Sequence, residues 1–278
     1  MIVGIVGLGL IGGSFGRTLN KCGHTVYGYD INPQTINKAV MLKAIDDVLT
    51  QDNAKSLDLL VIAVNPDVFE SALLGFIDKL KDGATVIDFC GTKRLVTEKM
   101  KEYSQKYPTL NFLGGHPMAG KEVSGIERSS ATLFNKASMI FCPVKADIFV
   151  LEKLKAFFLS LGFLEVVITS SENHDKMIAF TSQLCHIVSN AFIKNERASE
   201  HFGYSAGSYK DLTRVAKMDA NMWSTLMIEN GDNLVLELDE LISNLQKYSN
   251  ALHNGDKEQL KALLSEGDLR KREIDKRN

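Results

Sequence analysis

The chain has 278 residues, which is long enough for two domains that each bury a hydrophobic core. Hydrophobic residues make up 45% and charged residues 24% of the sequence, and the net charge of −2 gives no reason to expect a nucleic acid or an acidic membrane as a partner. The four cysteines lie far apart and no metal-ligand spacing such as H-E-x-x-H occurs, which argues against a disulfide framework and against a metal site.

A dinucleotide-binding turn is predicted at the start of the chain. Ile2–Val6 is a short run of mostly β-branched residues, typical of a buried strand, and the next six residues fit G-x-G-x-x-G. The first glycine allows the tight turn, the second lets the backbone approach a pyrophosphate, and the third lets the following helix pack on the strand. Free N–H groups at that helix start favour a bound diphosphate. The predicted cofactor-binding residues of this turn are Gly7, Gly9, Leu10, Ile11 and Gly12.

An acidic residue ends the second predicted strand, Thr25–Tyr29. The carboxylate of Asp30 can accept hydrogen bonds from both hydroxyls of an adenosine ribose and repels a 2′-phosphate, so NAD is favoured over NADP. The alternatives are a tight turn without a ligand and, for Asp30 alone, a helix-capping role before Asn32.

Strand and helix signals alternate through the first half of the chain, as a βαβ sheet requires. Leu57–Val64 is a continuous apolar run, which indicates a central strand buried on both faces, and a helix is expected over about 67–80. Ligands bind beyond the carboxyl ends of such strands, so the loops after the next two strands are expected near a nicotinamide ring. Further strands are predicted at Ala84–Phe89, Leu110–Leu113, Ser138–Pro143 and Phe163–Ile168, with a helix over about Asp147–Leu161 between the last two.

Long helical stretches replace this pattern beyond residue 169. We therefore predict an α/β fold with a Rossmann-type doubly wound sheet over residues 1–169 and an all-α substrate and dimerisation domain over residues 170–278. Ser171–Glu200 is predicted to form one long helix. Because no flexible linker joins the two parts, we expect the active site in the cleft between them. An apolar stripe at helical spacing, which predicts core or subunit contact, consists of Leu234, Leu238, Leu241 and Leu245.

The sequence also bears on the cellular location. The first predicted strand begins at the N-terminus, and no basic segment or cleavage site typical of a signal peptide precedes it. No apolar run approaches the ~20 residues that span a bilayer. We predict a cytoplasmic protein without a membrane partner.

His116 is the first candidate for chemistry. It follows two glycines at a predicted strand end and precedes Pro117, an arrangement that fixes an imidazole near the cofactor. A neutral imidazole can accept a proton from a hydroxyl while hydride leaves the same substrate. The alternative is a structural histidine bonded to the loop backbone.

A second group of candidates lies in the helical half. Lys210 and Arg214 are four residues apart and share a helix face, and the planar fork of Arg214 suits a carboxylate. Asp211 lies between them and could orient either cation. An exposed charge cluster is the alternative for all three.

Four other residues are weaker candidates. Ser182 and His186 are four apart on the predicted long helix and point the same way, although a buried core histidine is the commoner case. Glu122 follows the His116 loop as a candidate gating acid. Lys93 is a candidate positive charge near the cofactor. For both of these, a solvated side chain is the alternative.

Together these motifs resemble the prephenate dehydrogenase family, the cyclohexadienyl and arogenate dehydrogenases of tyrosine biosynthesis. The resemblance rests on GLGLIGGS near the start, the D-x-x-x-x-K loop Asp88–Lys93, GGHPMAG around His116, and D-x-T-R at Asp211–Arg214 with Trp223 after it. It implies NAD as cofactor, prephenate or arogenate as substrate, tyrosine as a candidate feedback inhibitor, and a homodimer formed through the helical domain.

The resemblance also assigns roles to residues. It implies that His116 binds the ring hydroxyl of the substrate as the catalytic base and that Arg214 holds a substrate carboxylate. The residues implied to line or gate the pocket are Ser182, His186, Glu122, Lys210 and Asp211.

The chain departs from the family pattern at three places, one of which is Lys121, at a position before Glu122 where a threonine can occur. Cys90-Gly91 stands where such enzymes often carry Gly-Ser, whose serine contacts the ring hydroxyl, and Ser182–His186 reads S-Q-L-C-H where S-H-L-P-H is common. These changes bear on the choice between prephenate and arogenate, not on the reaction type. Two other functions remain as alternatives: a β-hydroxyacid dehydrogenase and a non-catalytic NAD-binding regulator.

Overall fold

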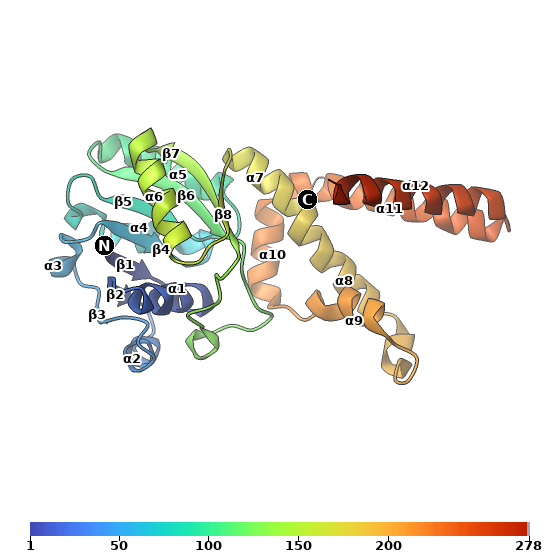
Figure 1. Cartoon of the computed structure of the whole chain (residues 1–278), viewed down its shortest axis with the longest axis horizontal. Helices are drawn as coiled ribbons and strands as arrows, with labels where there is room; N and C mark the ends of the chain where they lie inside the picture. The colour runs from blue at the N-terminus through green and yellow to red at the C-terminus, as the bar shows by residue number, and fades with distance from the viewer. Residues whose placement is uncertain (277–278) are drawn as a thin grey trace. The chain divides into compact units, whose positions relative to one another are not determined.

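The computed structural model describes residues 1–276 (Figure 1). The chain divides into two compact units, Met1–Asn230 and the residues from Gly231 onward. The domain boundary after residue 169 stays a prediction. None of the helices within the described residues is both long enough and apolar enough to cross a membrane.

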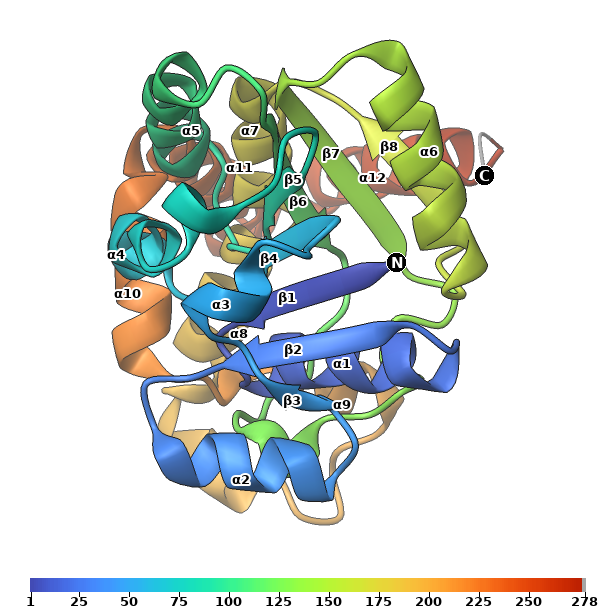
Figure 2. The same ribbon diagram turned by 90° about the vertical axis from the view of Figure 1, so that its left-hand side faces the viewer.

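The first unit is built on one eight-stranded sheet with the strand order β3-β2-β1-β4-β5-β6-β7-β8 (Figure 2). Neighbouring strands run parallel except β6 and β7, which are antiparallel. The strands are β1 (Ile2–Val6), β2 (Thr25–Tyr29), β3 (Asp47–Val48), β4 (Leu59–Ile62), β5 (Thr85–Asp88), β6 (Asn111–Pro117), β7 (Ser138–Lys145) and β8 (Glu165–Ile168). The predicted α/β class is confirmed, and the order 3-2-1-4-5-6 is that of dinucleotide-binding sheets.

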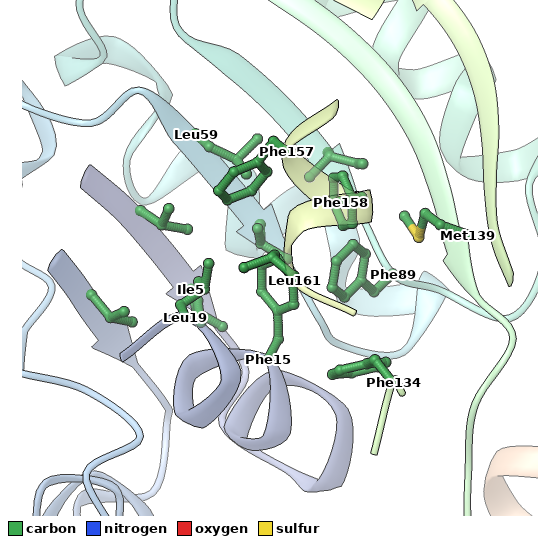
Figure 3. Close-up of a cluster of buried hydrophobic side chains, with 14 of the residues drawn as sticks. Ile5, Phe15, Leu19, Leu59, Phe89, Phe134, Met139, Phe157, Phe158 and Leu161 are labelled. Carbon is green, nitrogen blue, oxygen red and sulfur yellow. The ribbon is translucent and has the colours of Figure 1, made fainter. Parts of the chain in front are cut away.

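Helices cover both faces of this sheet because β4 is apolar on both sides. Leu59 and Val61 belong to one buried cluster, whereas Leu60 and Ile62 belong to another, as the continuous apolar run predicted. In the first cluster Phe158 contacts the rings of Phe15 and other aromatic residues (Figure 3). The helices on that face are α1 (Leu10–Lys21), α2 (Pro33–Met41) and α6 (Ile148–Ser160), and those on the other are α3 (Gln51–Ala54), α4 (Phe69–Leu74) and α5 (Arg94–Lys106).

The long helix predicted over Ser171–Glu200 is shorter and irregular. It consists of α7 (Ser171–Ile178), a π-helical segment (Ala179–Leu184) and α8 (Cys185–Ile193). The helix ends there because the side chain of Asn195 accepts a hydrogen bond from the N–H of Arg197 and starts a separate 3₁₀ turn. The helix expected over 67–80 is likewise broken into short segments. Two further helices, α9 (Gly207–Thr213) and α10 (Ala220–Glu229), complete the first unit.

The second unit is a helical hairpin of α11 (Gly231–His253) and α12 (Lys257–Asp275). Gly255 turns the chain with φ +63°, and the side chain of Asp256 accepts a hydrogen bond from Gln259 at the start of α12. Along the predicted leucine stripe of α11, Leu234 is buried and Leu245 is exposed. The stripe therefore leaves apolar surface uncovered on this unit.

Candidate active site

The three glycines of the turn between β1 and α1 have different surroundings, which indicate different roles. Gly7 adopts φ +92°, and a methyl group there would overlap the carbonyl of Ala63. A methyl group on Gly12 would overlap the carbonyl oxygen of Gly7 and lie 3.1 Å from its carbon. At Gly9, in contrast, a methyl group would meet nothing within 4 Å. The first and third glycines are therefore needed for packing, and the second faces open space.

The start of α1 and the end of β2 complete a dinucleotide-binding edge. No side chain caps α1 at Gly9, so its first N–H groups point toward the open side of the turn. The carboxylate of Asp30 accepts hydrogen bonds from the N–H groups of Leu8 and Asn32, each at 2.9 Å. Asn32, not Asp30, caps α2. Uncapped donors, an open turn and a fixed acidic residue fit the pyrophosphate and ribose of a dinucleotide.

The sequence predicted His116 in the loop after a strand, but the structure places it within β6. The strand extends to Pro117 because β7 continues the hydrogen-bond ladder antiparallel to it, with Ile140 opposite His116. The ring is half-buried. Its Nδ1 lies 2.8 Å from Nε2 of His174, whose Nδ1 lies 2.7 Å from Oδ1 of Asp175. These contacts link three side chains, from His116 near the carboxyl end of β6 to His174 and Asp175 on α7.

The protein environment favours the uncharged form of His116. Burial lowers the pKa of His116 well below its ordinary value of 6.5, and the neighbouring His174 and Lys93 lower it further. Burial also lowers the pKa of His174, although its hydrogen bond to Asp175 opposes the shift. A neutral imidazole at this position can accept a proton near neutral pH.

A buried ion pair supports the strand that carries His116. Lys93 and Asp88 are both fully buried, and the ammonium pairs with the carboxylate. Asp88 also accepts hydrogen bonds from the N–H of Cys90 at 2.8 Å and from that of Gly115 at 3.1 Å. The pair therefore joins the loop after β5 to the residue before His116. A contact between Lys93 and a cofactor stays a prediction.

The loop after β5 leaves no free space at Gly91. A methyl group there would lie 3.1 Å from Cδ1 of Leu226 on α10, tighter than most real contacts. The next residue, Thr92, donates a hydrogen bond to Glu229 at the end of α10 at 2.6 Å. Where a serine side chain would stand at position 91, this protein places a leucine from the helical region.

A second cluster gathers residues from four separate segments of the chain. Arg214 begins a 3₁₀ turn after α9, and its guanidinium pairs with Glu122, which follows β6. Nδ1 of His186 lies 3.0 Å from the carbonyl oxygen of Val215, and its ring centroid is 3.9 Å from that of Trp223. Burial lowers the pKa of His186, while the charges of Glu122 and Arg214 act on it in opposite directions. The cluster combines a half-exposed imidazole with a guanidinium that is 66% exposed.

The remaining predicted residues stand apart from these contacts. Lys210 and Asp211 are exposed on α9, and the carboxylate that pairs with Arg214 is that of Glu122, whereas the sequence offered Asp211 as a residue that could orient either Lys210 or Arg214. Ser182 is half-buried in the π-helical segment. A shallow hollow of about 580 Å³ between α8 and α9 is lined by Phe192 and other residues, none of them among the predicted site residues. The roles of these residues in substrate binding stay predictions.

Two family models match the chain in tandem. The model described as prephenate dehydrogenase, nucleotide-binding domain, matches residues 15–167, more than half of the chain. The model described as prephenate dehydrogenase, dimerization domain, matches residues 170–266. The chain belongs to the prephenate dehydrogenase family. The resemblance drawn from the sequence motifs is confirmed, and with it the assignment to a family of NAD-dependent oxidoreductases.

Known members of the prephenate dehydrogenase family are similar to this chain over nearly its whole length. A cyclohexadienyl dehydrogenase of Zymomonas mobilis is 28% identical, covering 91% of this chain and 89% of its own. A prephenate dehydrogenase of Bacillus subtilis is 29% identical, covering 92% of this chain and 71% of its own. An Aquifex aeolicus prephenate dehydrogenase, whose crystal structure was determined in complex with hydroxyphenyl propionate and NAD⁺, is 30% identical in sequence. Its structure aligns with a TM-score of 0.84 over 99% of this chain and 98% of its own.

Sequence reasoning missed part of the site in this family member. His174 and Asp175 are only 1% exposed although they lie in the first turns of a helix, where polar side chains usually face solvent. A histidine next to an aspartate, both placed just after the last strand, was the available signal.

Proposed function

We propose that the protein catalyses the NAD-dependent oxidative decarboxylation of prephenate to 4-hydroxyphenylpyruvate, a step of tyrosine biosynthesis. Arogenate, which would give tyrosine, is the alternative substrate. The observation that carries the proposal is the imidazole of His116 near the carboxyl end of β6, which lies at the same edge of the sheet as the β1–α1 turn, in a member of this family. The names of the Bacillus subtilis and Zymomonas mobilis relatives and the ligands of the Aquifex aeolicus structure support it.

NAD would be held by the residues of the β1–α1 turn and by Asp30. The open space at Gly9 suits the pyrophosphate, with the N–H groups of Leu10 and Ile11 as donors. The carboxylate of Asp30 suits the two hydroxyls of a ribose and disfavours a 2′-phosphate, which makes NAD the expected cofactor. When bound, this cofactor supplies the acceptor for a hydride.

His116 and Arg214 would act on opposite ends of the substrate. Nε2 of His116 would accept the proton of the ring hydroxyl while a hydride leaves the ring carbon that bears this hydroxyl. The ring carboxylate departs as CO₂, and its bonding electrons complete the aromatic ring. Because aromatisation drives the reaction, orientation and one base are the main requirements. Arg214 would bind a carboxylate of the substrate through its fork, and the anion would displace Glu122 from the guanidinium.

Other residues would shape the pocket. The imidazole of His186, adjacent to Arg214, would help to bind the same carboxylate, with Ser182, Lys210 and Asp211 around it. The match of residues 170–266 to a dimerization domain and the exposed leucines of α11 and α12 support a homodimer. Tyrosine as feedback inhibitor and a cytoplasmic location stay predictions.

A direct assay tests the proposed function. The purified protein is incubated with NAD⁺ or NADP⁺ and with prephenate or arogenate in parallel, and the absorbance of the reduced nicotinamide is followed. We expect turnover with prephenate and NAD⁺. Turnover with arogenate alone would shift the assignment to the alternative substrate. Intact NAD⁺ binding without turnover of either substrate would overturn the proposal in favour of a non-catalytic regulator.

A further inference from the structure

We infer that His174, held by Asp175, is a positioning residue that fixes the tautomer and ring orientation of His116. The inference rests on the proposed function insofar as His116 is the base. It concerns residues that no part of the assignment above requires. His174 lies between His116 and Asp175, contacts both, and is only 1% exposed, so it acts through the base and not on the substrate.

The hydrogen bonds from His116 through His174 to Asp175 can be donated in one direction only, because the Asp175 carboxylate can only accept. The Asp175 carboxylate accepts hydrogen bonds from the N–H groups of Lys93 at 2.7 Å and Arg94 at 2.9 Å, which begin α5. Burial alone would raise the pKa of Asp175, but these bonds and that of His174 hold it below its usual value. Asp175 is therefore ionised and can only accept.

The tautomers of both imidazoles follow from this acceptor. Nδ1 of neutral His174 carries the hydrogen that it donates to Asp175 at 2.7 Å, so its Nε2 has a free lone pair. That lone pair accepts from Nδ1 of His116 across 2.8 Å, so the hydrogen of His116 is on Nδ1. Nε2 of His116 is then left without a hydrogen. It is the nitrogen that can take a proton from a substrate.

The same chain would stabilise the product of proton transfer. Once Nε2 of His116 gains a proton, the ring is an imidazolium whose Nδ1–H donates a stronger bond to His174. The positive charge is then polarised toward Asp175, in the manner of an orienting carboxylate behind a catalytic histidine. Three other charged groups act on this chain: Lys93 lowers the pKa of both rings, Asp88 raises that of His174, and the guanidinium of Arg94 pairs with Asp175.

Two substitutions at position 174 separate positioning from mere packing. In His174→Gln, the amide oxygen can replace Nε2 and accept the hydrogen of His116. In His174→Asn, the shorter amide can replace Nδ1 and bond to Asp175 but leaves nothing opposite His116. We expect His174→Asn to lower kcat by about 10- to 100-fold with KM for the substrate and Kd for NAD⁺ nearly unchanged. We expect His174→Gln to stay within about fivefold of the wild-type kcat.

A spectroscopic readout tests the tautomer without any turnover. In the ¹⁵N spectrum of the uniformly labelled full-length protein at neutral pH, His116 is assigned by its loss in His116→Asn. We expect a protonated Nδ1 and a bare Nε2 in the wild type and in His174→Gln, and a shift toward the Nε2–H form in His174→Asn. His24→Asn is the matched control, since His24 contacts the N-terminal amine before β2, at the opposite edge of the sheet.

The outcomes are distinct. An Nε2–H tautomer of His116 in the wild type would overturn the inference even if the enzyme were active. Equal losses in both variants, accompanied by a lower Tm and an unchanged tautomer, would show that His174 only packs and would also overturn it. If the wild type turns over neither substrate, the proposed function fails, but the tautomer measurement still decides the inference.

Discussion

An added methyl group should weaken the binding of NAD⁺ when it is placed on Gly9 of the β1–α1 turn, but should destabilise the fold when it is placed on Gly12. We consider Gly9→Ala and Gly12→Ala, with Gly267→Ala on the exposed face of α12 as the control for the substitution itself. A methyl group on Gly9 meets nothing within 4 Å, whereas one on Gly12 is closer than 3.0 Å to the carbonyl oxygen of Gly7. The first change therefore affects a ligand and the second affects the fold.

The magnitudes follow from these spaces. Gly9→Ala should change the free energy of unfolding of the NAD-free protein by less than about 1 kcal/mol, because no neighbour has to move. It should raise the Kd for NAD⁺ by at least about tenfold, or ~1.4 kcal/mol, because the methyl group projects into the space where a pyrophosphate would approach the backbone. Gly12→Ala forces α1 away from β1 and should lower the free energy of unfolding by about 2–4 kcal/mol.

Two measurements on the full chain distinguish the effects. Urea unfolding followed by circular dichroism without NAD⁺ gives the free energy of unfolding, and isothermal titration calorimetry gives the Kd for NAD⁺. Gly267→Ala should leave the Kd unchanged. If Gly9→Ala destabilised the NAD-free protein as much as Gly12→Ala, or bound NAD⁺ as tightly as the wild type, the division of roles among the glycines would be refuted.

Other substitutions should act on single steps. His116→Asn should lower kcat by about 10²–10⁴-fold while the Kd for NAD⁺, measured by calorimetry, stays the same; an unchanged kcat would remove His116 as the base. Arg214→Ala should raise KM for prephenate by about 30-fold or more, on the order of 2 kcal/mol, because a carboxylate loses a charged hydrogen-bond partner; an unchanged KM in steady-state assays would contradict the clamp. Asp30→Ala should weaken NAD⁺ and reduce its preference over NADP⁺, as kcat/KM with each cofactor would show. The proposed base, His116, would act in its neutral form, and its pKa is lowered well below 6.5; kcat/KM should therefore stay high below pH 6.5 and fall only as pH drops through that lowered pKa. A value of kcat/KM already halved at pH 6.5 would argue against His116 as the base.

Much of the fold was predictable because its signals are local. The apolar run of β4 has no polar face and so required cover on both sides, and the spacing of Gly7, Gly9 and Gly12 reflected a turn whose sterics the structure shows directly. The strand carrying His116 was predicted too short, because its last residues contain two glycines and a proline. They extend only because β7 pairs with them, and pairing between distant segments leaves no local signal.

The candidate site was predictable in the residues that belong to sequence motifs and less so in the residues that contact them. His116 and Arg214 belong to motifs, but the partner of Arg214 proved to be Glu122, which lies 92 residues away in sequence. The contact of His174 with His116 spans 58 residues and that of Asp175 with Lys93 spans 82. Such contacts depend on how α7 lies beside α5, and helical periodicity says nothing about that placement.

The number of residues in the π-helical segment Ala179–Leu184 determines how α8 is rotated about its axis relative to α7. An α-helix turns by about 100° per residue, so deleting one residue and restoring regular turns would rotate all of α8 by about that angle. His186 would leave Trp223 and the carbonyl of Val215, while α7 and its hold on His116 would stay in place. Single-residue length variants of this segment would therefore move His186 and leave α7 in place, which would separate the proposed recognition of a carboxylate from the proposed proton transfer to His116.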